Sequence, residues 1–153
     1  MEFKIPHPLK EEHEELHGEL KKAVMAGGKV GEAARAVAQA LHAHFESEEK
    51  YALPPLGLLP ALAEGKITPE MAEVFSMTDK LKAELPRMLE EHQAIVTALK
   101  QLKEAARQAK KPEVAAFAEK LMLHAQTEEE VSYPTTILIG EYLKLKLGVA
   151  GPG

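Results

Sequence analysis

A histidine followed four residues later by a glutamate occurs twice in this chain, each time in the same context. His44 and Glu48 recur 80 positions later as His124 and Glu128. In both copies a leucine lies three residues before the histidine and a proline lies six residues after the glutamate. Two copies of one pattern at a fixed separation indicate an internal duplication, which restricts the chain to folds with two similar halves.

A second segment repeats at nearly the same separation. The sequence Glu-Glu-His ends at His13 and again at His92, 79 positions later, and apolar residues follow each copy at intervals of three and four. Such intervals are typical of a helix with one buried face. Each half therefore offers one histidine on a first helix and a His-x3-Glu pair on the next.

The apolar residues predict four long helices and a last amphipathic one. The expected ranges are residues 9–26, 31–53, 69–111 and 112–133, with the last helix over residues 137–147. Two glycines after the first range suit a left-handed turn into the second helix. No stretch alternates between apolar and polar residues over a useful length, so we expect no strands.

Prolines and a leucine-rich connection interrupt this pattern. Pro54 is expected to end the second helix, and Pro134 to end or bend the fourth. Pro86 is expected to kink or restart the third helix. Thr68 is a suitable N-cap for that third helix. The apolar stretch over residues 56–65 is expected to form a short helical turn, or lid, over one end of the helices.

These features predict an all-α fold: an antiparallel up-down four-helix bundle with an inserted lid or short helix and an extra C-terminal helix. The length of 153 residues suits a single domain, which we place at residues 1–147, followed by a flexible tail at residues 148–153. Ala, Leu, Glu and Lys are abundant, as in helices, and the chain has no tryptophan, so we expect an aliphatic core.

Charge and composition argue against several classes of function. The net charge of −5 comes without a basic stripe, so we expect no nucleic-acid partner. No apolar run is long enough to cross a membrane, and the N-terminus has no apolar leader, so we expect a cytoplasmic protein. We expect it to be a monomer or a homodimer. The chain has no cysteine, so any metal must be held by nitrogen and oxygen donors.

The repeated polar residues all fall on the helix faces that are otherwise apolar. They are His13, His44, Glu48, His92, His124 and Glu128. A buried carboxylate without a partner costs several kcal/mol. These helices therefore either face water at the two glutamates or enclose a cation there.

Distances along the chain place these residues at one level of the bundle. His13 and His44 are nearly equidistant from the turn between their helices, as are His92 and Glu128 from theirs. With a rise of about 1.5 Å per residue, each ligand lies ~22–27 Å from its turn. Four imidazoles and two carboxylates then converge in mid-bundle, a donor set that suits two iron ions, with zinc or manganese as alternatives.

Two other interpretations remain open from the residues alone. His13-Glu14-x-x-His17 matches the His-Glu-x-x-His motif of zinc hydrolases, in which both histidines bind zinc and the glutamate is the general base. A lone core histidine is more often structural, and a His-x3-Glu pair is often an exposed helix pair, which would leave a metal-free helical interaction module. Four histidines and two glutamates in register, in duplicate, favour the metal site.

Taken together, four segments resemble the hemerythrin-like domain family, also called the HHE cation-binding domain. The segments are Glu11-Glu12-His13-Glu14-Glu15-Leu16, His44-Phe45-Glu46-Ser47-Glu48-Glu49, Glu90-Glu91-His92, and His124-Ala125-Gln126-Thr127-Glu128-Glu129 running on to Tyr133-Pro134. The resemblance extends over residues 9–142. It implies an antiparallel four-helix bundle with a non-haem di-iron centre, whose two iron ions are bridged by carboxylates and by oxo or hydroxo species.

The resemblance also implies a role for each ligand. It assigns the terminal ligands to His13, His44, His92 and His124. Glu48 is implied as one bridge between the metal ions. The second bridge is Glu128 or Glu129, because family members place this carboxylate four or five residues after the last histidine, and the duplication favours Glu128.

One departure from the family bears on function. Oxygen-carrying hemerythrins have a histidine four residues before the one that matches His92, and here that position is Met88, a poor ligand for iron. One iron would therefore lack a ligand or take His17 instead. We expect either an open iron position that binds O2, NO or peroxide, or a centre that senses or handles iron. The sequence leaves open whether the protein is an enzyme.

Overall fold

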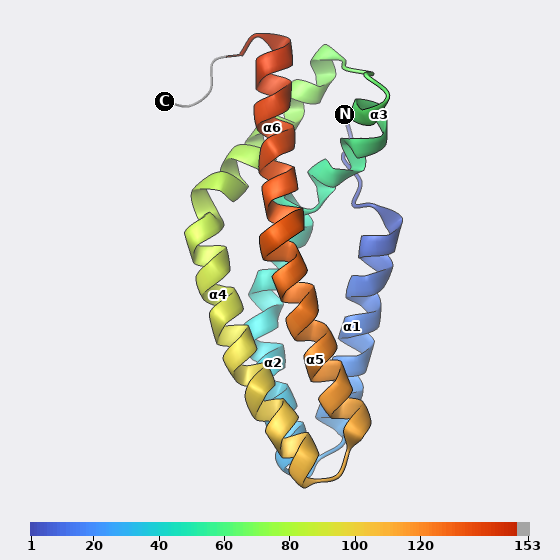
Figure 1. Cartoon of the computed structure of the whole chain (residues 1–153), viewed down its shortest axis with the longest axis vertical. Helices are drawn as coiled ribbons and strands as arrows, with labels where there is room; N and C mark the ends of the chain where they lie inside the picture. Colours follow the sequence, from blue (N-terminus) through green and yellow to red (C-terminus); the bar gives the residue numbers. More distant parts are fainter. Residues whose placement is uncertain (150–153) are drawn as a thin grey trace.

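Four long helices form the body of the protein. They are α1 (His7–Met25), α2 (Gly28–Ser47), α4 (Phe75–Gln108) and α5 (Pro112–Thr127). The computed structural model describes residues 1–149, and all regular structure in that range is helical. Figure 1 shows the helices running alternately up and down, with the α1–α2 and α4–α5 turns at the same end. The predicted all-α, antiparallel four-helix bundle is confirmed; the predicted tail lies outside the described residues from residue 150 onward.

Each long helix packs against two others. Helix α1 contacts α2 and α5, and α4 contacts the same two. The turn between α1 and α2 is tight because Gly27 and Gly28 have φ angles of 71° and 60°, in the left-handed region that glycine enters without strain. Within the described residues, no helix combines the length and apolar character needed to span a bilayer.

Shorter elements close the end of the bundle opposite these turns. Two 3-10 helices, Pro54–Leu58 and Pro69–Val74, flank the short helix α3 (Leu59–Ala63) in the connection between the halves. Figure 1 shows α3 beside the N-terminus at this end. An apolar cluster joins this connection to the last helix through Leu53, Leu56, Leu58, Met71, Val74, Ile139 and Leu143. The predicted lid is therefore a seal over the bundle end.

The third helix differs from its prediction at its start and agrees with it at Pro86. It begins as a 3-10 helix before α4, and Thr68 makes no side-chain hydrogen bond to cap it. Pro86 lies inside α4, which continues through it and bends along its length in Figure 1. The bend is the expected effect of a proline that clashes with the preceding turn and donates no hydrogen bond.

The two His-x3-Glu segments share an irregularity that begins at the glutamate. Each helix widens there into one turn of π-helix, over Glu48–Ala52 and over Glu128–Ser132. In the first of these turns the Leu53 N–H donates to the Glu48 carbonyl at 2.9 Å. Such turns are rare and occur frequently at functional sites. The duplication seen in the sequence is therefore also a duplication of local backbone structure.

Pro134 does not end or bend the fourth helix, contrary to prediction. The second π-helix leads directly into α6 (Tyr133–Leu147), and Figure 1 shows α5 and α6 as one long rod. Pro134 lies in the first turn of α6, where a missing N–H costs no helical hydrogen bond. The extra C-terminal helix is thus an extension of the fourth. It is also less amphipathic than predicted, since Leu138 and Leu145 are exposed.

The core consists of apolar clusters on either side of a polar layer. Toward the tight turns, the large members include Leu16, Leu20, Val37, Leu41, Ile95, Leu99, Leu102, Phe117 and Leu121. On the other side the cluster is formed by Tyr51, Ala52, Leu81, Met88 and Tyr133. The polar side chains between them are therefore enclosed by apolar groups along the bundle axis.

Candidate metal centre

Six polar side chains meet in the layer between these clusters. They are His13 from α1, His44 from α2, His92 from α4, His124 from α5, and Glu48 and Glu128 from the first positions of the two π-helices. Their exposed fractions range from 0% at Glu48 to 9% at His124. The structure therefore brings together all six residues that the repeated pattern placed on core positions.

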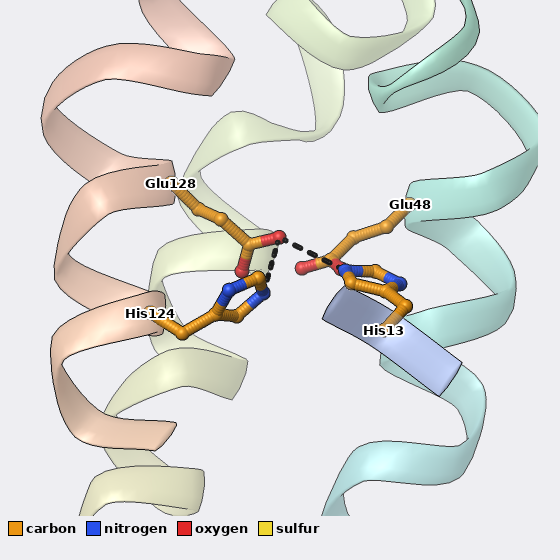
Figure 2. A group of neighbouring side chains, drawn as sticks. All are labelled: His13, Glu48, His124 and Glu128. Atoms are coloured by element: carbon orange, nitrogen blue, oxygen red, sulfur yellow. Dashed lines mark ion pairs between the residues drawn. The ribbon is translucent and has the colours of Figure 1, made fainter. Parts of the chain in front are cut away.

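The first group of possible ligands consists of His13, Glu48, His124 and Glu128. Nε2 of His13 lies 3.3 Å from Oε2 of Glu48 and 3.6 Å from Oε2 of Glu128. Nε2 of His124 lies 3.3 Å from the same Oε2 of Glu128. Figure 2 shows the two imidazoles and the two carboxylates directed toward one another, with His124 and Glu128 on one continuous helix and Glu48 and His13 on others.

The second group consists of His44, Glu48, His92 and Glu128. Nε2 of His44 lies 2.7 Å from Oε1 of Glu48, and Nε2 of His92 lies 3.4 Å from Oε1 of Glu128. Both carboxylates thus present Oε2 to the first group and Oε1 to the second. A carboxylate that offers one oxygen to each of two neighbouring positions has the geometry of a bridge between two cations.

Several buried atoms in this layer have no hydrogen-bond partner among the described residues. They include Nε2 of His13 and His124, and Oε2 of Glu48 and Glu128. Leaving a buried polar atom unsatisfied costs about 1–3 kcal/mol. All four atoms belong to the first group and face one another, so one cation between them would satisfy all four. The residues present therefore fit a metal ion.

Carboxylates also lie on the outer side of the imidazoles. Nδ1 of His44 lies 2.9 Å from Oε1 of Glu91, and Nδ1 of His92 lies 3.0 Å from Oε1 of Glu129. In both pairs the carboxylate comes from a helix next to the one that carries the histidine. A hydrogen bond at Nδ1 leaves Nε2 as the free donor nitrogen and fixes the orientation of the ring.

The other two imidazoles have the equivalent partners. Nδ1 of His124 is hydrogen-bonded to Glu12, and Nδ1 of His13 lies 3.6 Å from Oε1 of Glu49. The duplication relates the pair His13–Glu49 to His92–Glu129, and the pair His124–Glu12 to His44–Glu91. The outer carboxylates therefore repeat in the same way as the inner ligands. Outer partners of this kind are typical of metal-binding histidines.

The imidazoles and carboxylates of the layer shift one another's pKa values. Burial lowers the pKa of His13 and of His92, but the adjacent carboxylates of Glu128 and Glu48 outweigh burial and raise both pKa values to about 10. Burial raises the pKa of Glu48, whereas the imidazoles of His13 and His44 hold it well below its usual range. Without a cation, the layer is held by imidazolium–carboxylate pairs. A metal ion must therefore displace protons from the imidazoles.

Tyr133 places a hydroxyl group in the second group of ligands. The buried side chain donates a hydrogen bond to Oε1 of Glu48 at 2.6 Å. Its oxygen also lies 3.1 Å from Nε2 of His44 and 3.1 Å from Nε2 of His92. Burial and the negative charge of Glu48 raise the pKa of this phenol above its usual range.

Met88 contributes no donor to either group. Its buried Sδ accepts a hydrogen bond from the Tyr51 hydroxyl at 3.7 Å. Arg87 in turn donates to the Tyr51 oxygen at 2.9 Å. The position that carries a histidine in oxygen-carrying hemerythrins is therefore occupied by a thioether that packs against Tyr51.

Two of the predicted ligands lie outside both groups. The exposed ring of His17 packs edge-on against Phe45, with 5.1 Å between centroids. Glu129 points outward to Nδ1 of His92, whereas the neighbouring Glu128 points into the layer. Glu14 is exposed, so the His-Glu-x-x-His motif does not converge on one point.

The sequence interpretation missed the positions of Glu12 and Glu91. Each directly precedes a histidine of the layer, but its hydrogen bond goes to a histidine on an adjacent helix. Helix periodicity identifies neighbours along one helix, so it could not supply these partners. The signal was present in the repeated Glu-Glu-His segment, in which the glutamates recur together with the histidine.

Comparison with known proteins agrees with this geometry. A family model described as the hemerythrin HHE cation binding domain matches residues 4–136, which include all six residues of the layer and both π-helices. Searches of curated proteins and of solved structures returned no match. With the match extending over most of its length, the chain belongs to the hemerythrin HHE cation-binding domain family.

Proposed function

We propose that the protein holds two iron ions as a non-haem di-iron centre bridged by Glu48 and Glu128. The observation that carries the proposal is that both carboxylates belong to two separate groups of possible metal ligands. One ion takes the two imidazoles of the first group, and the other takes those of the second. A single ion would leave two equally buried imidazoles without a metal.

The donor set supports iron over other metals. The layer offers imidazole nitrogen and carboxylate oxygen, and the chain has no cysteine to supply the soft thiolate that zinc and copper often take. Zinc in structural sites takes four ligands, whereas here two carboxylates are shared between two positions. Zinc and manganese are the alternative occupants of the same residues.

We further propose that a small molecule such as O2, NO or peroxide binds at an open metal position, or that the centre senses or handles iron. Bound iron supplies coordination positions and one-electron redox chemistry. The chain supplies the rest: apolar clusters keep bulk water out, and outer carboxylates hydrogen-bonded to Nδ1 of His44, His92 and His124 hold their Nε2 atoms toward the layer. Donors held in place in this way need little rearrangement when metal binds.

The zinc hydrolase alternative receives less support from the geometry. His13 is buried with Nε2 directed at Glu48, whereas His17 and Glu14 are exposed on the surface of α1. A cytoplasmic location and the absence of nucleic-acid and membrane partners remain predictions from the sequence, as does a monomeric or homodimeric state.

The test is the iron content per chain after expression with iron, together with the optical spectrum before and after reduction by dithionite and re-exposure to air. We expect two irons and a charge-transfer band in the visible or near-ultraviolet region. His44→Ala and Glu48→Ala should lose the band. The matched control is His42→Ala, because His42 and Glu46 have the same spacing on the same helix but are exposed, with 3.7 Å between Nε2 and Oε1.

Each other outcome points to a different interpretation. One zinc per chain without a band would favour the hydrolase motif at His13 and His17. A chain that binds no metal would favour the helical interaction module. A band that survives His44→Ala would remove this histidine from the ligand set.

A further inference from the structure

The Tyr133 hydroxyl lies among the donors of one metal position. The side chain is 0% exposed, and its oxygen lies 2.6 Å from Glu48, 3.1 Å from His44 and 3.1 Å from His92. All three neighbours belong to the second group of possible ligands. The hydroxyl thus contacts three of the four donors that would surround the second ion.

The spacing of these atoms matches a coordination sphere. First-row metal ions bind imidazole nitrogen at about 2.0–2.1 Å, so neighbouring donors in an octahedral sphere lie about 3 Å apart. The two distances of 3.1 Å from Tyr133 to the imidazoles fit this value. So do the 2.7 Å between His44 and Glu48 and the 3.4 Å between His92 and Glu128.

We propose that Tyr133 is a ligand of the iron ion held by His44 and His92, and that it binds through its phenolate oxygen. The inference rests on the di-iron function proposed above. When the bond forms, the phenol O–H bond breaks, the oxygen donates an electron pair to the metal, and the proton is released to solvent.

The first half of the chain has no counterpart to Tyr133. Eighty positions before Tyr133 the chain has Leu53, a buried residue of the apolar cluster under the lid. The first group, with His13 and His124, therefore receives no donor from the equivalent position. The two ions differ accordingly: the second is the more fully ligated by protein, and an incoming small molecule binds to the first.

The test uses the fact that the chain has three tyrosines in all. The double variant Tyr51→Phe/Tyr142→Phe keeps Tyr133 as the sole tyrosine and alters neither group of ligands. The iron-loaded, oxidised protein is examined by resonance Raman spectroscopy with visible excitation, which enhances the ring vibrations of an iron-bound phenolate. We expect these vibrations in the wild type and in the double variant, and their loss in Tyr133→Phe with two irons still bound.

Other results overturn the inference in distinguishable ways. A wild-type protein with two irons and no phenolate vibrations refutes the ligand role of Tyr133 but leaves the di-iron function intact. Vibrations that persist in Tyr133→Phe assign the phenolate to another tyrosine. A wild type without iron removes the proposed function and this inference together. If Tyr133→Phe fails to retain iron, the spectrum of the double variant decides alone.

Discussion

Three consecutive glutamates after His124 should respond in three different ways to replacement by glutamine. Glu128 is buried, with Oε1 3.4 Å from His92 and Oε2 3.3 Å from His124. Glu129 is 38% exposed and contacts Nδ1 of His92 at 3.0 Å. Glu130 is exposed. The three positions therefore separate a bridging carboxylate, an outer hydrogen-bond partner and a surface charge.

The expected magnitudes follow from these contacts. Glutamine at position 128 keeps one carbonyl oxygen but replaces the other by an amide donor, so it cannot bridge, and we expect fewer than two metal ions per chain. Glu129→Gln retains both ions and an acceptor oxygen for Nδ1 of His92, but loss of the outer negative charge lowers metal affinity by about 10- to 100-fold. That change equals about 1.4–2.7 kcal/mol and concerns the ion bound by His92. Glu130→Gln should leave affinity unchanged.

The assay is a titration of each variant with iron in competition with a chelator, followed by metal analysis of the saturated protein. Glu130→Gln is the control for the loss of one surface charge. The family also contains members with the bridge five residues after the last histidine, which here would be Glu129. If Glu129→Gln loses an ion while Glu128→Gln keeps two, this assignment of the layer is refuted.

Three further predictions concern protons, stability and the core. Because the pKa values of His13 and His92 are about 10 in the metal-free protein, iron binding at pH 7 should release at least two protons. Calorimetry in buffers of different ionisation enthalpy measures this release, and heats independent of the buffer would contradict it. Both pKa values are raised from 6.5, so the two histidines stabilise the metal-free protein fully below pH 6.5 and no longer do so as the pH approaches 10. The free energy of urea unfolding should therefore fall across this pH range. Leu99→Ala, at a site with 0% exposure, should cost about 2–5 kcal/mol in urea unfolding while folded chains still bind two metal ions.

Much of the fold follows from features that act along a single helix. Apolar spacing located the four long helices, and the glycines at positions 27 and 28 marked a turn that requires positive φ angles. The duplication placed six polar residues on core faces at one level, and the structure brings all six together. These features are local or repeated, so one sequence is enough to show them.

The remaining features depend on contacts between helices. Pro134 was expected to end or bend a helix, but the helix runs on through a π-turn into α6, which carries the proline in its first turn. The same turn leads into Tyr133, whose hydroxyl reaches the layer from a neighbouring helix and donates to Glu48. Glu12 and Glu91 take partners from adjacent helices, which periodicity within one helix does not reveal.

The central claim is that two metal ions share Glu48 and Glu128, and anomalous diffraction from crystals of the iron-loaded protein tests it most directly. Data collected on both sides of the iron absorption edge identify the element as well as its position. We predict two iron peaks in the polar layer, one between His13 and His124 and the other between His44 and His92. A single peak, or a peak elsewhere in the bundle, would contradict the account.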